Sequence, residues 1–189
     1  MGEITHSILV AIMFVMILSI GIASLLMAMA AVINQGAKCK RYALHTSWMI
    51  LLLLVYFNLF WQTLSLVSIE DWMFQDFLFV MAGPVILLFA ASLLVPEITG
   101  EGSLDLRTHY FGISRQFFSL LALAQIWTVG TDFVLRRGFT SGSGFNFVFM
   151  GLALALAFSK APKLHGLVSG VIWLLFVVSI GLRGLGIIV

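Results

Sequence analysis

Long apolar stretches separated by short polar ones make up almost the whole chain. A helix needs about 20 mostly apolar residues to cross the hydrocarbon core of a bilayer. The apolar stretches cover residues 7–33, 47–69, 77–95, 117–134, 145–158 and 167–188. The pattern therefore predicts an all-α fold, a polytopic transmembrane helix bundle with about six spans, in which residues 1–189 form a single domain.

Residues 145–158 are short for a span, and a re-entrant segment is the alternative there. The basic residues favour a crossing, because Lys and Arg concentrate in cytoplasmic loops. With six spans, the odd-numbered loops hold seven of the ten basic residues, namely Lys38, Lys40, Arg41, Arg107, Arg115, Lys160 and Lys163. This orientation places both termini outside and the first loop, with Cys39, in the cytoplasm.

Composition agrees with a membrane location. Hydrophobic residues make up 61% of the chain and charged residues 10%, whereas about a quarter of a soluble domain is charged. The ten Lys and Arg residues are dispersed, so the chain lacks the basic stripe that binds a nucleic-acid backbone. Cys39 is the only cysteine, which rules out an intrachain disulfide. We expect the lipid bilayer as the main partner and no nucleic acid.

Small residues recur at helical spacing on two segments. Gly21, Ser24, Ala28 and Ala31 share a face of the first segment, and Gly166 and Gly170 form a GxxxG pattern in the sixth. Such faces let helix backbones approach closely. Helix packing within one chain is the expected use, and an interface of a homo-oligomer or with a membrane protein partner is the alternative.

Gly83 and Pro84 lie near the middle of the third segment. Proline cannot donate a hydrogen bond to the carbonyl of Val80, so a helix break or kink is predicted here. An ordinary kink satisfied by neighbouring helices is the expected outcome. The alternative is an unwound stretch of the kind that forms substrate sites in transporters.

Polar residues inside the apolar segments are the candidate site. Gln125, Thr128 and Asp132 are spaced three and four residues apart, so they share one helix face. Asn58 and Gln62 give the second segment a polar side. These side chains either hydrogen-bond helices to one another or line a polar path together with Gln125.

An ionisable group inside a span is costly and points to a functional site. Asp132 and Arg183 lie at a similar depth on the fourth and sixth segments, which predicts an ion pair between them. Arg136, one turn along from Asp132, is a competing partner.

Three histidines precede the even-numbered spans. They are His45, His109 and His165. Three imidazoles can bind a transition metal and two can ligate a haem, but no HExxH or comparable spacing accompanies them. We expect hydrated histidines at the cytoplasmic surface, with no cofactor and no metal site.

Four stretches in the middle of the chain carry a resemblance to other proteins. They are residues 45–61, which begin His-Thr-Ser-Trp, residues 72–84, Val95-Pro96-Glu97, and residues 105–111, which read Asp-Leu-Arg-Thr-His-Tyr-Phe. These stretches resemble a loose group of uncharacterised small bacterial inner-membrane proteins with about six transmembrane helices. The resemblance implies a bacterial plasma membrane and no particular mechanism.

Motifs for enzymatic chemistry are absent from the sequence, which has neither a GxxxxGK(S/T) phosphate loop nor a GxSxG nucleophile motif. We expect a small transport or permeation protein whose polar path runs between helices. The alternative is a non-catalytic membrane subunit or scaffold that binds through its small-residue faces, and a haem or metal redox protein is a third hypothesis. Polar side chains that share a cavity would favour transport, whereas polar side chains consumed in helix contacts would favour the scaffold.

Overall fold

The computed structural model describes residues 6–36, 39–69, 71–96, 104–135 and 143–184. Within these residues the fold is all-α, as the sequence predicts, with six α-helices and one pair of two-residue strands. The helices are α1 (His6–Asn34), α2 (Ala43–Gln62), α3 (Phe74–Leu94), α4 (Leu106–Val134), α5 (Ser143–Phe158) and α6 (Pro162–Gly184). Each helix corresponds to one of the predicted apolar stretches.

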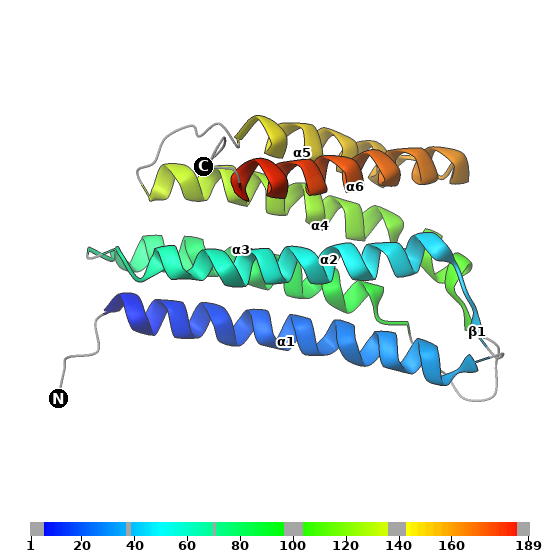
Figure 1. Cartoon of the computed structure of the whole chain (residues 1–189), viewed down its shortest axis with the longest axis horizontal. Helices are drawn as coiled ribbons and strands as arrows, with labels where there is room; N and C mark the ends of the chain where they lie inside the picture. Colours follow the sequence, from blue (N-terminus) through cyan, green and yellow to red (C-terminus); the bar gives the residue numbers. More distant parts are fainter. Residues whose placement is uncertain (1–5, 37–38, 70, 97–103, 136–142, 185–189) are drawn as a thin grey trace.

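The helices lie roughly along one axis, and each reverses the direction of the helix before it (Figure 1). α1 packs on α2 and α3, α3 packs on α4, and α5 packs on both α4 and α6. A 3₁₀ turn, η2 (Thr63–Leu66), extends α2. As a result, α1 begins and α6 ends at the same end of the bundle, which we call the terminal end.

Two short strands mark the opposite end, which we call the strand end. β1 (Cys39–Lys40) follows α1, and β2 (Leu104–Asp105) directly precedes α4. They pair in parallel, with Cys39 opposite Leu104 and Lys40 opposite Asp105. The pair ties the first and third connections of the chain together, so these connections lie on the same side of the bundle.

Five helices of the described chain are long and apolar enough to cross a membrane, by their length and composition. They are α1, α2 with η2, α3, α4, and the Pro162–Leu182 part of α6. α5 has 16 described residues, which span about 24 Å at roughly 1.5 Å per residue, less than a hydrocarbon core of about 30 Å. The described helices therefore support a membrane location. The length of α5 does not decide whether this helix crosses the membrane.

α4 begins eleven residues before the predicted apolar stretch, at Leu106 instead of residue 117. The polar residues in its first turns hide this start from a hydropathy pattern. Asp105 caps the helix, because its carboxylate accepts hydrogen bonds from the backbone N–H groups of Arg107 at 2.9 Å and Thr108 at 3.3 Å. The bond from the Thr108 N–H is the main reason that the pKa of Asp105 lies below its usual value.

Gly21 shows how the small residues of α1 are used. Its place beside Tyr56 leaves no room for a side chain, because a Cβ there would overlap the Tyr56 ring and hydroxyl. Ala28, two turns further along α1, is 2% exposed, and Ser24 and Ala31 are half-buried. This face of α1 therefore packs inside the chain, as expected for close helix contact.

Gly83 and Pro84 do not unwind α3, which continues through both residues as one helix. Trp127 of α4 fills the space over Gly83, where a Cβ would overlap the indole ring. The indole N–H of Trp127 donates a hydrogen bond of 2.8 Å to the carbonyl oxygen of Phe79, one turn before Gly83. The neighbouring helix therefore accommodates this segment, and the alternative of an unwound site is wrong.

Gly166 and Gly170 on α6 differ from Gly21. A Cβ at either position would meet nothing within 4 Å. Gly170 is exposed and Gly166 half-buried. Their GxxxG face is therefore not used for close helix packing in this chain.

These environments give a matched pair of substitutions. Gly21→Ala forces a methyl group into the Tyr56 ring and should lower the free energy of unfolding by about 1–3 kcal/mol. Gly170→Ala adds a methyl group in open space and should be neutral, or stabilise by up to about 1 kcal/mol through helix propensity. Thermal unfolding in one detergent measures both. Equal effects of the two substitutions would show that Gly21 is not under the steric constraint described here.

Candidate functional site

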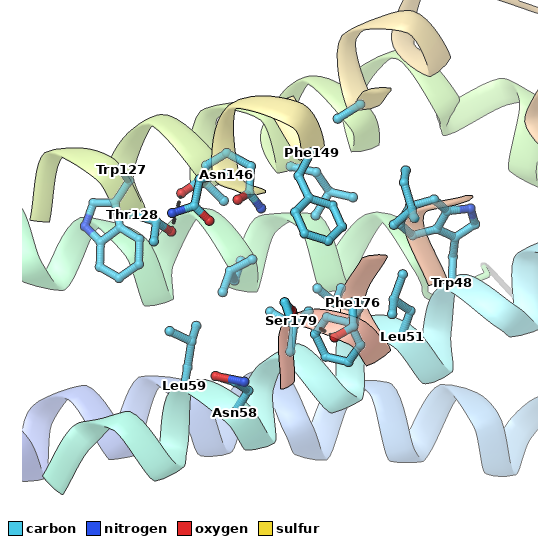
Figure 2. Close-up of a pocket in the computed structure, with 18 of the residues that line it drawn as sticks. Trp48, Leu51, Asn58, Leu59, Trp127, Thr128, Asn146, Phe149, Phe176 and Ser179 are labelled. Atoms are coloured by element: carbon cyan, nitrogen blue, oxygen red, sulfur yellow. Dashed lines mark hydrogen bonds between the residues drawn. The ribbon is translucent and has the colours of Figure 1, made fainter. Parts of the chain in front are cut away.

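A partly open cavity of about 150 Å³ lies between α2 and helices α4, α5 and α6 (Figure 2). Leu87 is the α3 residue that lines it, and α1 contributes none of the described lining residues. Most of the wall is apolar or aromatic, with Trp127, Phe149 and Phe176 among the larger groups. This is the usual make-up of a small-molecule site, in which a few polar groups are set among apolar ones.

Four of the polar residues singled out from the sequence line this cavity. They are Asn58 and Gln62 of α2 and Gln125 and Thr128 of α4. Gln125 and Thr128 both reach the cavity because they share one face of α4. The pair on α2, Asn58 and Gln62, lines the same cavity only because α2 packs opposite α4. The structure therefore places the predicted residues around one cavity.

Two further polar residues of the cavity were not predicted. Asn146 lies in the first turn of α5, and Ser179 lies in the last part of α6. Each is a polar residue in a mainly apolar segment, at the depth of Gln125 and Thr128. This match in depth is the feature of the sequence from which they could have been predicted. All six polar groups lie toward the terminal end, so that end of the cavity is its polar part.

Most of these polar groups bond within their own helix. The Gln62 amide donates to the Asn58 side-chain oxygen. The Thr128 hydroxyl donates to the Ala124 carbonyl at 2.9 Å, and the Ser179 hydroxyl to the Phe176 carbonyl at 2.8 Å. In the described part of the chain, the carboxamides of Gln125 and Asn146 have no hydrogen-bond partner.

Asp132 and Arg183 relate to the cavity differently. Asp132 is half-buried one turn beyond Thr128 and is not a lining residue. The side chains of Arg183 and Arg136 lie outside the described part of the structure. The ion pair of Asp132 with Arg183, and the competing pair with Arg136, therefore stay predictions.

Trp48 closes the cavity toward the strand end. Its side chain is 3% exposed and packs edge-on against Phe117 and Phe118, with ring centroids 5.6 and 4.9 Å away. Its indole N–H donates to the Ser169 hydroxyl on α6 at 3.0 Å. In return, the Trp173 indole N–H of α6 donates to the Ser47 hydroxyl of α2 at 2.6 Å. Two reciprocal Trp–Ser bonds thus join α2 and α6 at the strand end of the cavity. We call Trp48 and these two bonds the floor of the cavity.

His165 lies beneath this floor and is fully buried, at 0% exposure. One ring nitrogen, Nδ1, lies 2.9 Å from the Tyr110 hydroxyl, and the other, Nε2, lies 2.9 Å from the Ser159 carbonyl oxygen. The expectation of a hydrated histidine at the surface is wrong for this residue. Its position before an apolar stretch suggested water, but the rings of Tyr110, Phe111 and Phe118 on α4 pack against it.

His45 and His109 meet at the end of α3. Their ring centroids are 5.5 Å apart, and each Nε2 lies 3.1 Å from a carbonyl oxygen of the last turn of α3, Leu94 for His45 and Leu93 for His109. The last carbonyls of a helix have no partner within it. The two rings therefore cap α3, and His45, at 0% exposure, is not hydrated as expected.

The histidines do not assemble into a metal-binding group. Among the described residues, no group of three or more His, Cys, Asp or Glu side chains is placed to hold a metal ion. Both nitrogens of His165 and one nitrogen each of His45 and His109 are already engaged by protein atoms. That the protein binds no haem or metal stays a prediction.

Comparison with known proteins finds no matching family model, no similar curated protein and no similar solved structure.

Tyr110 provides a test of the buried polar contact beneath the floor. Tyr110→Phe leaves Nδ1 of His165 buried without its partner, which should cost about 1–3 kcal/mol of unfolding free energy. Tyr42→Phe is the matched control, because Tyr42 packs against Tyr110 at 5.5 Å between ring centroids and is only half-buried. Thermal unfolding in detergent compares the two. A control as damaging as Tyr110→Phe would refute a specific role for the bond to His165.

Proposed function

We propose that this chain is a small integral membrane protein that lets a small solute cross the bilayer, with the cavity as its solute site. The observation that carries the proposal is the convergence of polar side chains from α2, α4, α5 and α6 on one cavity. Hydrocarbon offers polar side chains no partner, so they are expected to face one another, water or a bound solute.

The hydrogen bonds of these side chains favour transport over a purely structural role. Polar residues that hold helices together bond from one helix to another. Here the bonds of Asn58 with Gln62, of Thr128 and of Ser179 all stay within one helix. Among the described residues, the carboxamides and hydroxyls of the cavity therefore do not link helices, unlike the indoles of Trp48 and Trp127, and a solute supplies a reason for their presence.

The scaffold alternative rests on one specific observation. The Gly166 and Gly170 face of α6 is open, with nothing within 4 Å of a Cβ at either position. An open GxxxG face can take a helix of a second copy or of another membrane protein. This use is compatible with transport, because the face and the cavity are separate features of α6.

We further propose six spans in a bacterial inner membrane, with the strand end in the cytoplasm and both termini outside. The direction of α5 supports a crossing, because it runs from the end where α4 stops to the end where α6 starts (Figure 1). The exposed basic residues of the described chain gather toward the strand end, and they are Lys40, Arg41, Arg107, Arg115, Lys160 and Lys163. This distribution follows the positive-inside rule.

Cysteine labelling tests the orientation. Cys39 itself is a poor probe, since it is 6% exposed and packs with Val32 and Leu106. In a Cys39→Ser background, a cysteine replacing exposed Asp71 should react with a membrane-impermeant maleimide on intact cells. A cysteine replacing exposed Lys163, at the other end, should react only after the cells are opened. The opposite pattern would reverse the orientation.

Solute uptake into vesicles tests the transport function. Purified protein in liposomes should speed the uptake of at least one of four labelled solutes, urea, acetamide, guanidinium or acetate, relative to protein-free liposomes. Ser179→Phe, which puts a phenyl ring into the cavity, should return uptake to the protein-free rate. Ser119→Phe is the control, because Ser119 is exposed on α4 away from the cavity. Uptake that Ser179→Phe leaves unchanged would exclude the cavity as the route.

A further inference from the structure

The cavity also indicates which class of solute it accepts. We infer that its solute is a small, electrically neutral molecule that both donates and accepts hydrogen bonds, such as a simple amide. This inference rests on the proposed transport function and adds the chemistry of the substrate. Three properties of the cavity carry it, namely the charge of its lining, its unused hydrogen-bonding groups and its size.

Among the described residues, the lining holds no ionisable side chain. The 19 described lining residues include four carboxamides and two hydroxyls, and the rest are apolar or aromatic. A charge moved among these residues loses hydration and gains no counter-ion from them, which disfavours its entry. The nearest acidic group along α4, Asp132, is not part of the lining. The walls therefore disfavour both cations and anions.

Oxygen ligands for a dehydrated metal cation are also few. Selective cation sites replace the hydration shell with several backbone carbonyl or carboxylate oxygens. In this cavity the lining residues lie within α-helices, where backbone carbonyls are occupied by the helical hydrogen bonds. Side-chain oxygens alone would have to solvate the ion, and the Asn58 oxygen already accepts the Gln62 amide.

Gln125 and Asn146 supply the recognition of a neutral solute. Both line the cavity, Gln125 from α4 and Asn146 from the adjacent helix α5, and Figure 2 labels Asn146. In the described structure neither carboxamide is hydrogen-bonded. A carboxamide offers both an acceptor oxygen and a donor NH₂ group. Two of them lining one cavity are complementary to a solute that presents donors and acceptors together, as an amide or a urea does.

The size of the cavity limits the solute to a few heavy atoms. A volume of about 150 Å³ is comparable to that of an engineered cavity of about 150 Å³ that binds benzene. Trp127, Phe149 and Phe176 provide apolar surface for the carbon atoms of a molecule of this size. An amino acid with both charges would bring two ions among described lining residues that offer no counter-ion.

Two pairs of labelled solutes of nearly equal shape test the charge selectivity. Urea is compared with guanidinium, and acetamide with acetate, in uptake by liposomes that contain the full-length protein. Potassium and valinomycin hold the membrane potential at zero, so that charged solutes are not slowed by a diffusion potential. We expect faster uptake of urea or acetamide than in protein-free liposomes, and protein-free rates for guanidinium and acetate.

Substitutions at the two carboxamides test the recognition itself. Gln125→Leu removes the hydrogen-bonding groups with little change in size and should slow neutral uptake about tenfold, the effect of losing roughly one good hydrogen bond. Asn146→Leu should do the same. Gln125→Glu should slow neutral uptake and admit guanidinium. Gln116→Leu and Gln116→Glu are matched controls, because Gln116 is exposed on the same helix and does not line the cavity.

The outcomes separate the inference from the function on which it rests. Accelerated uptake of guanidinium or acetate without urea or acetamide would overturn the neutral-solute inference and leave transport standing. No acceleration of any solute, with protein that gel filtration shows to be folded, would overturn transport and the inference with it. Neutral uptake that Gln125→Leu and Asn146→Leu leave at the wild-type rate would refute the role of the two carboxamides.

Discussion

Polar groups inside a membrane helix bundle can bond only to one another or to what the bundle encloses, because lipid offers no hydrogen-bond partner. The two ends of this protein meet that constraint differently. Toward the strand end, bonds cross between helices, as from Trp48 to Ser169 and between Tyr110 and His165. Toward the terminal end, the Trp127 indole of the cavity wall also bonds across, to Phe79 of α3, but the carboxamides and hydroxyls of the cavity bond within their own helices or, among the described residues, not at all. The bonds toward the strand end hold the helices together. The carboxamides of the cavity keep unused hydrogen-bonding groups, which under the proposed function bind the solute.

This division gives the cavity one polar part and one closed floor. Trp48 belongs to both, since it lines the cavity and donates to Ser169 beneath it. Passage of a solute beyond the floor would require this indole to move and the reciprocal bond from Trp173 to Ser47 to adjust. Burial of Trp48 among Phe117 and Phe118 resists such movement. Under the proposed function, the floor is therefore the barrier that sets the rate of crossing.

The sequence predicts helices well here, because an apolar run of span length has few other stable structures in lipid. It also predicts Gln125 and Thr128 on one face, since helical spacing is a local property. The neighbours of that face are not local, so Asn146 and Ser179 were missed although each is polar within an apolar segment. The histidines were misjudged for the same reason. Position at a helix entrance suggested water, whereas the packing of α4 around His165, and of His45 against α3, removes it.

The distribution of close helix contacts explains why a cavity remains at all. Gly21 brings α1 against Tyr56 of α2, and Gly83 brings α3 against Trp127 of α4. Contacts of this kind let helices approach without leaving space between them. The glycines of α6, Gly166 and Gly170, make no such contact with the described residues, and α6 is joined to α2 by the Trp48–Ser169 and Trp173–Ser47 bonds instead. Large side chains, Trp48, Phe149 and Phe176, occupy that region instead. In the described chain, α2 and α6 are therefore joined through long side chains and not through a glycine contact, and the cavity with its polar groups lies beside these side chains.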